Sequence, residues 1–171
     1  SPNSLAIARN HLKHARLQEG DATDLKDFED NSFNTVLCLG VAHHTPDPKK
    51  VFDECVRLCR KEGKIIFAVY RKNSFYYYDY FLFNKAVKLI FRLKSERLFF
   101  LLFKLWFKFL YGGKFLDNKT LLSSITDRYL SPVVKFLQQW EIMEWINEKD
   151  LHLLKISYTS RNSVINIVAG K

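Results

Sequence analysis

Residues 32–70 constrain the fold of this chain most, because they read without interruption as strand, loop, helix and strand. Residues 34–39 form a short apolar run typical of a strand that is buried on both faces. Apolar residues recur at helical spacing over residues 48–61, and residues 64–70 return to a strand pattern. Two strands joined through a helix in this way run parallel, and ligands of such sheets bind at the carboxyl ends of the strands. The segment therefore predicts a parallel βαβ unit with a site in its loop.

The helix of this unit carries sequence signals at both ends. The Asp47 carboxylate can cap the first turn, and Pro48 suits the first helical position, where a missing N–H costs nothing. Gly63 is expected to end the helix. These signals leave residues 40–46 as the loop that follows the first strand, at the predicted site edge of the sheet.

The rest of the chain contains further helices and strands but no internal repeat. Ser131 followed by Pro132 is expected to open a helix. The predicted elements are a helix at 3–14, a strand at 16–20, helices within 75–93 and 95–111, a helix at 132–148, and strands at 151–158 and 163–169. Only four residues separate the last two strands, so we expect these strands to pair as an antiparallel hairpin.

Two motifs resemble class I S-adenosylmethionine-dependent methyltransferases, and most of all their small-molecule and lipid branch. Residues 40–48, followed by residues 51–54, look like the segment between the fourth and fifth strands of that family. Upstream, residues 19–25 are similar to its third strand and adenine-site loop. The resemblance covers residues 1–70 and implies an α/β fold with a Rossmann-like sheet. It also implies a sheet that ends in an antiparallel hairpin, as the pattern of the last two strands predicts.

The resemblance is incomplete, because the family's first strand and Gly-rich loop have no counterpart in these residues. The chain has only six glycines, and none of them form G-x-G. We therefore expect the carboxyl-terminal portion of a methyltransferase, with an incomplete sheet and no turnover of its own. The expected divisions are a partial cofactor-binding α/β core, an inserted α-helical cap, and the final helix and hairpin of the core, at residues 1–70, 71–130 and 131–171.

The resemblance implies S-adenosylmethionine as the cofactor and names the residues that would hold it. Asp21 would accept a hydrogen bond from the adenine amino group, with the Ala22 N–H nearby and Leu25 packing on the ring. Leu39 and Gly40 would leave their strand beneath the cofactor, where a small residue permits close approach of the backbone. The alternatives are that Asp21 only caps a turn and that Gly40 only serves one.

His43 and His44 are the candidate catalytic residues. Either imidazole could take a proton from an acceptor hydroxyl or amine near neutral pH. The commoner alternative is a histidine whose hydrogen bonds are satisfied by the loop backbone. Residues 127–129 resemble a segment that shapes the acceptor pocket in many such enzymes, and they could equally form a polar surface connector. No metal site is predicted, because the cysteines, at Cys38, Cys55 and Cys59, are better explained as small core residues.

Residues 71–116 hold nearly all of the chain's net charge. They contain ten Lys or Arg and two acidic residues, a net of +8 within a formal +9, and 16 of the 26 aromatic residues. Helical projection of residues 81–93 and 97–111 gathers bases on one side, which is typical of amphipathic helices at a membrane surface. The alternative is that both helices fold over the active site as an apolar lid, with the lysines on its outer face. The apolar runs are too short to cross a bilayer. Nucleic acid is the least favoured partner, because the aromatic residues lie on continuous apolar faces.

Two functions compete at this point. The first is methyl transfer from S-adenosylmethionine to a small-molecule or lipid-like acceptor. The second is a membrane-surface or partner-binding module, built on residues 71–116 over a non-catalytic scaffold. The expected partners are the acceptor, an anionic membrane surface, and a second copy of the chain bound through residues 71–116. An odd number of buried cysteines favours a cytoplasmic protein, peripheral at the membrane.

Overall fold

The computed structural model describes residues 2–92, 101, 103–106, 108–109 and 117–171. Its helices and strands are α1 (Pro2–His11), β1 (Phe33–Leu39), the 3₁₀ turn η1 (Ala42–His44), α2 (Pro48–Leu58), β2 (Cys59–Tyr70), α3 (Phe75–Arg92), α5 (Asn118–Ile125), the π-helical turn η2 (Thr126–Leu130), α6 (Gln139–Glu148), β3 (His152–Thr159) and β4 (Val164–Gly170). Residues 101, 103–106 and 108–109 are also helical. The predicted mixed α/β class is confirmed.

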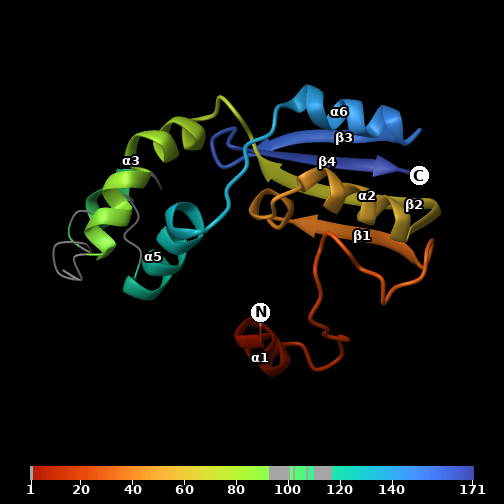
Figure 1. Ribbon diagram of the computed structural model, residues 1–171, viewed down its shortest axis with the longest axis horizontal. Helices are drawn as coiled ribbons and strands as arrows, with labels where there is room; N and C mark the ends of the chain where they lie inside the picture. The colour runs from red at the N-terminus through yellow and green to blue at the C-terminus, as the bar shows by residue number, and fades with distance from the viewer. Residues whose placement is uncertain (1, 93–100, 102, 107, 110–116) are drawn as a thin grey trace.

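The four strands form one open sheet in the order β1-β2-β4-β3 (Figure 1). β1 and β2 run parallel, as the βαβ pattern predicts. β4 lies antiparallel to both β2 and β3. The predicted hairpin of the last two strands is therefore confirmed. The carboxyl ends of β1 and β2 point toward α3 and α5, which lie beyond this end of the sheet (Figure 1).

α2 begins as the sequence predicts and ends earlier. Asp47 accepts a hydrogen bond from Lys50 N at 3.0 Å, and Pro48 opens the helix. The prediction that Gly63 ends the helix is wrong, because α2 ends at Leu58 and Gly63 lies within β2. A Cβ at Gly63 would lie 2.6 Å from Cys59 Sγ and 2.9 Å from Asn34 O. A glycine is needed there for close packing between strands, so it is not a helix cap.

The main hydrophobic core lies between one face of the sheet and the helices α2 and α6. Alternate residues of β2 and β4 point into it, as the buried Phe67 and Ile167 show. The Phe52 ring packs edge-on against Phe67, with centroids 5.3 Å apart, and lies 5.7 Å from the Trp145 ring. The buried thiols of Cys38, Cys55 and Cys59 belong to this core and form no disulfide, in agreement with their predicted role.

The outer strand β1 differs from its prediction. Only Cys38 of this strand is buried, and the Leu37 side chain is 61% exposed, so burial on both faces is wrong. β1 is an edge strand in the described sheet, and α2 and α6 cover only one face.

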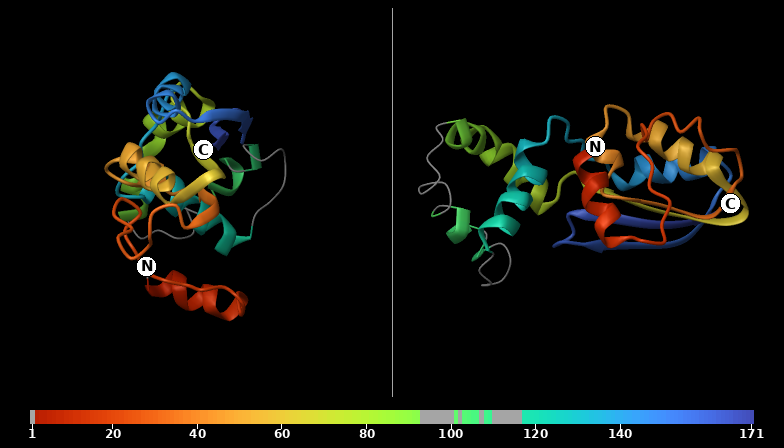
Figure 2. Two further views of the ribbon diagram at one scale, coloured as in Figure 1. Left: turned by 90° about the vertical axis from the view of Figure 1, so that its right-hand side faces the viewer. Right: turned by 90° about the horizontal axis from the view of Figure 1, so that it is seen from below.

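The prediction of a strand at 16–20 is also wrong, because these residues pair with no strand in the described part of the chain. A single extended segment without a ladder partner leaves its backbone groups to water. α1, confirmed as a helix, lies apart from the sheet (Figures 1 and 2).

α3, α5 and η2 form a helical segment with a core of its own. The buried residues of this core are Val87, Phe103, Leu121, Ile125 and Tyr129. The helix predicted within 75–93 is confirmed as α3, whereas Lys94, Arg97 and most of residues 95–111 lie outside the described residues. Leu82 and Leu89, on the apolar side of α3, are both exposed. None of the described helices is long and apolar enough to span a membrane.

The helix predicted at 132–148 begins only at Gln139. Gln138 and Glu141 form a capping box, which sets the start of α6. The preceding residues run alongside the end of β2: Leu137 N donates to Tyr70 O, and Lys72 N donates to Leu137 O, each at 2.9 Å. This segment connects η2 to α6 across the carboxyl end of the parallel strands. The sequence pattern did not predict the helix α5, whose first turn is capped by the Asp117 carboxylate.

Candidate active site

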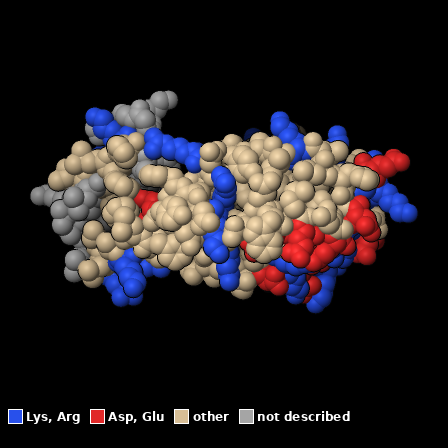
Figure 3. All heavy atoms as spheres, turned by 90° about the horizontal axis from the view of Figure 1, so that it is seen from above, with Lys and Arg blue, Asp and Glu red and all other residues tan. Residues whose placement is uncertain are grey.

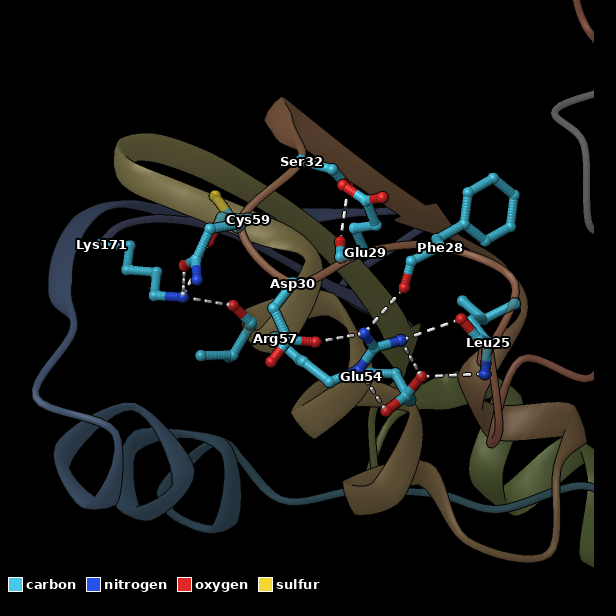
Figure 4. A network of polar contacts seen from close by, with 11 residues as sticks. Leu25, Phe28, Glu29, Asp30, Ser32, Glu54, Arg57, Cys59 and Lys171 are labelled. Atoms are coloured by element: carbon cyan, nitrogen blue, oxygen red, sulfur yellow. Dashed lines mark hydrogen bonds and ion pairs between the residues drawn. The ribbon is translucent and has the colours of Figure 1, made fainter.

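Arg57 of α2 holds the loop before β1 in place (Figure 4). Its Nη1 donates to Phe28 O at 2.9 Å and to Asp30 Oδ1 at 2.6 Å, and its Nη2 donates to Leu25 O at 2.9 Å. Glu54, one turn earlier on α2, binds the same guanidinium and accepts from Leu25 N at 2.8 Å. The Arg57 contact lowers the pKa of the Glu54 carboxyl. The loop that contains Leu25 is thus fixed to α2 by an ion pair whose i, i+3 spacing is readable in the sequence.

Lys171 closes the other end of this network (Figure 4). Its Nζ donates to Val56 O and Cys59 O, at 2.8 Å and 2.7 Å, and to Asn31 Oδ1 at 2.8 Å. A cation at the last carbonyls of a helix satisfies acceptors that have no intrahelical partner and complements the helix dipole. The loop before β1, the end of α2 and β4 are therefore joined at the edge opposite the predicted site.

Asp21 lies in a turn at the mouth of a cavity. Its Oδ1 accepts from both the N–H and the hydroxyl of Thr23, each at 2.8 Å, and these bonds lower the pKa of the carboxyl. The cavity has a volume of about 390 Å³, and we call it the Asp21 cavity; it is lined by Asp21, Thr23, His44, Thr45, Pro46, Asp47 and Lys50. The two sequence motifs, one before β1 and one after it, therefore meet on a single cavity.

Leu39 and Gly40 lie at the carboxyl end of β1. Gly40 has a φ of +76°, which side chains with a Cβ rarely adopt, and no atom lies within 4 Å of the place where its Cβ would be. Its N–H donates to Ala68 O of β2 at 3.3 Å. The turn requires this glycine, and open space lies in front of it. Ala22, on the loop before β1, packs against the main core.

His43 and His44 lie side by side in η1 but in different surroundings. His43 is 2% exposed, and its ring lies against the Tyr70 ring with centroids 3.7 Å apart. Both of its ring nitrogens are buried without a hydrogen-bond partner among the described residues. Burial, helped by the neighbouring His44, lowers the pKa of His43 to about 3. His43 is therefore a neutral, internal side chain.

His44 is held by groups from the segment that follows η2. Its Nδ1 donates to Val133 O at 2.9 Å and lies 2.9 Å from Ser131 Oγ. Its Nε2 lies 3.5 Å from Asp127 Oδ1, and the Tyr70 hydroxyl donates to Asp127 Oδ2 at 3.0 Å. The Asp127 carboxylate raises the pKa of His44, and His44 lowers the pKa of Asp127. The pair therefore favours the imidazolium facing a carboxylate.

A second cavity lies on the other side of this pair. It has a volume of about 280 Å³, and we call it the Asp127 cavity; it is lined by Tyr70, Tyr76, Ser124, Asp127, Arg128, Ser160, Ser163 and Val164. His44 lines the first cavity and Asp127 lines the second. The His44–Asp127 pair thus borders both cavities, at the carboxyl end of the parallel strands.

The structure brings Asp21 and His44 onto one cavity, whereas Leu39 and Gly40 line the adjacent strand end. His43 lines neither cavity. Sequence reasoning missed two hydrogen-bond partners of His44, Ser131 and Val133, and the Tyr70 ring that packs edge-on against it. The position of Tyr70 as the last residue of a predicted strand was the one available signal, because site residues follow parallel strands.

Comparison with known proteins finds similarity to methyltransferases. Residues 1–67 match the family model described as a methyltransferase domain. A ubiquinone biosynthesis O-methyltransferase of Idiomarina loihiensis is 33% identical over 78 residues, covering 41% of this chain and 30% of the relative. A phosphatidylethanolamine N-methyltransferase of Cereibacter sphaeroides is 38% identical over 50 residues, covering 29% of this chain and 24% of the relative. The matched segments thus span less than a third of the length of these relatives.

Solved structures share the fold over nearly the whole chain. An S-adenosylmethionine-dependent methyltransferase of Thermotoga maritima has a TM-score of 0.58 at 16% identity, covering 99% of this chain and 69% of the other. A 1,6-didemethyltoxoflavin-N1-methyltransferase of Burkholderia thailandensis, solved with S-adenosylhomocysteine, has a TM-score of 0.53 at 11% identity, covering 99% and 56%. At such identities the likeness shows the fold, so the sheet and its helices have the Rossmann-like arrangement of these methyltransferases.

Proposed function

We propose that this chain, whose residues 1–67 match a methyltransferase domain, is part of a class I S-adenosylmethionine-dependent methyltransferase and serves methyl transfer to a small or lipid-like acceptor. The observation that carries the proposal is the meeting of Asp21 and His44 on one cavity at the carboxyl end of the parallel strands. The names of the curated relatives, an O-methyltransferase of ubiquinone biosynthesis and a phosphatidylethanolamine N-methyltransferase, support an acceptor of this class.

The family match and the fold support S-adenosylmethionine as the cofactor, and the Asp21 cavity fits its adenine end. A carboxylate stands at the mouth of the cavity, and the backbone at Gly40 faces open space. We assign the holding of the cofactor to the five residues predicted from the motifs: Asp21, Ala22, Leu25, Leu39 and Gly40. S-adenosylmethionine supplies an activated methyl group, so the protein's part is to position the acceptor and exclude water.

The contacts favour a positioning role for His44 over the predicted role of a base. In the imidazolium form both ring nitrogens are donors, one to Val133 O and one toward Asp127, and neither has a lone pair for an acceptor proton. His43 lies buried against Tyr70 and lines neither cavity. Among the described groups at this edge, the partly exposed Asp127 carboxylate is better placed to meet an acceptor.

An Asp21→Asn variant of the protein that carries this chain tests the proposal. The amide keeps the bond to Thr23 and removes the charge that would accept from an adenine amino group. We expect the dissociation constant for S-adenosylmethionine to rise by about 5- to 150-fold, which corresponds to about 1–3 kcal/mol for an unsatisfied buried donor. Asp24→Asn is the matched control, because Asp24 lies in the same loop and pairs with the exposed Lys26. Equal binding by the two variants would contradict the assignment.

The 171-residue chain alone gives a second measurement. The described residues offer no Gly-rich loop beside β1 for the methionine end of the cofactor, and the outer edge of β1 pairs with no described strand. We expect calorimetry on this chain to show no micromolar binding of S-adenosylmethionine and no methyl transfer. Micromolar binding would show that residues 1–171 suffice for the cofactor.

The exposed apolar residues of the helical segment favour a second role at an anionic membrane surface. Leu82 is 72% exposed and Phe109 is 68% exposed, among other large apolar side chains of α3 and residues 101–109. In Figure 3 basic side chains outnumber acidic ones at this end of the molecule, whereas both occur together at the end that contains the sheet. Each Lys or Arg near an anionic surface contributes about 1 kcal/mol, and apolar insertion adds a part that salt does not screen.

Vesicle co-sedimentation tests this second role. Phe103 and Trp106 pack inside the helical segment, so Leu82→Glu and Phe109→Glu are the informative variants. We expect binding to anionic vesicles that falls with salt and falls further in both variants. Trp140→Glu is the matched control, because Trp140 is an exposed apolar residue on α6. Equal indifference to neutral and anionic vesicles would end the membrane role, and sedimentation equilibrium would then decide whether the same face binds a second copy of the chain.

A further inference from the structure

A further cavity lies along α3, in the helical segment beyond the carboxyl ends of the parallel strands (Figure 1). It has a volume of about 230 Å³, and we call it the α3 cavity; it is lined by Phe83, Ala86, Val87, Ile90, Phe103 and Trp106. Among these described residues, only Trp106 carries a polar atom in its side chain. The Asp21 cavity and the Asp127 cavity, in contrast, both have charged walls. Neither the sequence motifs nor the cofactor assignment uses the α3 cavity.

The size and the lining of the α3 cavity select its occupant. An apolar cavity of about 150 Å³ stays free of water and takes up benzene, and the α3 cavity is larger. An empty cavity leaves the atoms of its wall without packing contacts on one side. Water, a polar group or a peptide main chain would lose hydrogen bonds there, because the wall offers almost no partner. An apolar group is therefore the occupant that the cavity favours.

The entrance of the α3 cavity lies beside Ala86. Of the lining residues, Ala86 is the exposed one, whereas Val87 and Phe103 are buried. Leu82 precedes Ala86 by four residues and Leu89 follows it by three, so both neighbour it on the helix surface. Both leucines are exposed. The small side chain of Ala86 thus leaves an opening between two apolar side chains that face away from the core.

We propose that the α3 cavity binds the apolar chain of a lipid molecule, whose remainder stays outside beside Ala86. A methylene group fills about as much space as a water molecule, about 30 Å³, so the cavity has room for about eight of them. The exposed leucines at the entrance give the next part of the chain an apolar surface to follow. The inference goes beyond the proposed function, because it names a ligand site in a region that takes no part in holding the cofactor. The chain belongs either to the methyl acceptor or to a membrane lipid, and vesicle binding separates these two sources.

Binding of straight-chain alcohols to the protein that carries this chain, measured by calorimetry, tests the inference. We expect the dissociation constant to fall about fourfold for each methylene added from 1-butanol to 1-octanol, because each buried methylene contributes a similar transfer free energy. Beyond about eight carbons the cavity is full, so 1-decanol should bind about as tightly as 1-octanol. Affinity that keeps rising through 1-decanol would indicate adsorption to exposed apolar surface and would overturn the inference. Absence of alcohol binding would overturn it as well.

Variants at the entrance and in the wall locate the bound alcohol. Ala86→Phe adds a ring at the entrance and should weaken 1-octanol binding by at least about tenfold, since exclusion of only two methylenes already costs more than that. Leu122→Phe, which adds a ring at an exposed position of α5 outside the cavity, should leave binding unchanged. Val87→Ala enlarges the cavity and should move the plateau of affinity to a longer alcohol, which a misfolded helical segment would not do. Equal 1-octanol binding by Ala86→Phe and Leu122→Phe would place the alcohol elsewhere and contradict the inference.

Co-sedimentation with phosphatidylglycerol vesicles separates the two sources of the chain. If a membrane lipid supplies it, Ala86→Phe should bind the vesicles more weakly than Leu122→Phe. If the methyl acceptor supplies it, the two variants should bind the vesicles equally. Either result agrees with the cavity once 1-octanol binds as expected. Methyl transfer is no part of the alcohol measurement, so failure of this inference and failure of the proposed function are distinguishable.

Discussion

The core under the sheet and the core of the helical segment are built in different ways. Under the sheet, apolar side chains from α2, α6 and alternate positions of β2 and β4 meet, and the strand backbones pair in ladders. In the helical segment a carboxylate is buried: Asp79 of α3 is 4% exposed and accepts from the Tyr129 hydroxyl of η2. Burial raises the pKa of Asp79. Apolar packing and strand pairing hold the sheet core. The core of the helical segment combines apolar packing with the Asp79–Tyr129 hydrogen bond.

The difference matters at the junction between the two regions. The Tyr70 ring at the end of β2 contacts both His43 and Tyr76, with centroids 3.7 Å and 4.7 Å apart. Tyr76 in turn donates to Arg128 O in η2. Aromatic side chains thus connect the helical segment to the candidate site. A region held by polar pairs of fixed geometry can position site groups such as Asp127 more specifically than apolar packing alone.

Removal of a ring from the sheet core should have the largest effect on stability. Phe52 is fully buried and contacts both Phe67 and Trp145, so Phe52→Ala leaves a cavity between the sheet and α6. We expect the free energy of unfolding in urea to fall by about 3–5 kcal/mol. Leu122→Ala, at an exposed position of α5, should change it by less than about 0.5 kcal/mol. A loss below about 1 kcal/mol for Phe52→Ala would show that the sheet core is not closely packed.

Removal of one hydroxyl from the helical segment should lower stability by a smaller amount. Side-chain volume hardly changes, so the loss would come from the missing hydrogen bond. Tyr129→Phe keeps the ring and leaves the Asp79 carboxyl buried without this donor. We expect the free energy of unfolding to fall by about 1–3 kcal/mol. In the double variant Tyr129→Phe, Asp79→Leu, which removes both polar partners, we expect part of this loss to be recovered. If Tyr129→Phe is as stable as the unmodified protein, the Asp79–Tyr129 hydrogen bond does not stabilise the helical segment.

The smallest effect should be a change in pH dependence at the junction. The folded-state pKa of His43, about 3, lies below the ordinary value near 6.5, so its neutral form is favoured by folding. The stability from His43 is therefore present above about pH 6.5 and is lost as the pH falls toward 3, by at most about 1.4 kcal/mol per pH unit. The raised pKa of His44 acts with the opposite sign, because its contribution is lost as the pH rises through the folded pKa.

Urea unfolding at pH 7, 6 and 5 measures this effect. We expect His43→Leu to lose less stability between pH 6 and pH 5 than the unmodified protein, by about 1 kcal/mol. His14→Leu, at an exposed position before β1, should leave the pH dependence unchanged. Parallel pH profiles for His43→Leu and the unmodified protein would place the titrating group elsewhere.

Local patterns determined much of the fold. The βαβ unit, the Asp47 cap, the start of α2 at Pro48 and the final hairpin all follow from residues within a few positions of one another. A cap or a helical repeat acts over one or two turns, so its signal stays in the sequence. The motif resemblance likewise brought Asp21, Gly40 and His44 into one candidate site, and the structure places Asp21 and His44 on one cavity.

Local patterns failed where distant contacts decide the outcome. Gly63 is typical of a helix end, and the approach of Cys59, Arg60 and Asn34 in the folded chain shows why β2 needs a glycine there. Residues 16–20 have strand character, yet a strand forms only where a partner lies beside it. Leu82 and Leu89 share the apolar side of α3 with Phe83 and Ile90 in the helical projection, and only the folded chain shows that Phe83 and Ile90 pack inside while the two leucines are exposed.

The sequence by itself determined a parallel strand pair with a motif loop at its carboxyl end, because hydrophobic period, caps and turns are properties of neighbouring residues. Only the tertiary structure decided what surrounds His44. Tyr70, Asp127 and Ser131 reach it from positions far along the chain. These contacts form because the chain between η2 and α6 runs back across the end of β2. The opposite pKa shifts of the two adjacent histidines follow from that return, because burial and a carboxylate partner are properties of the folded chain.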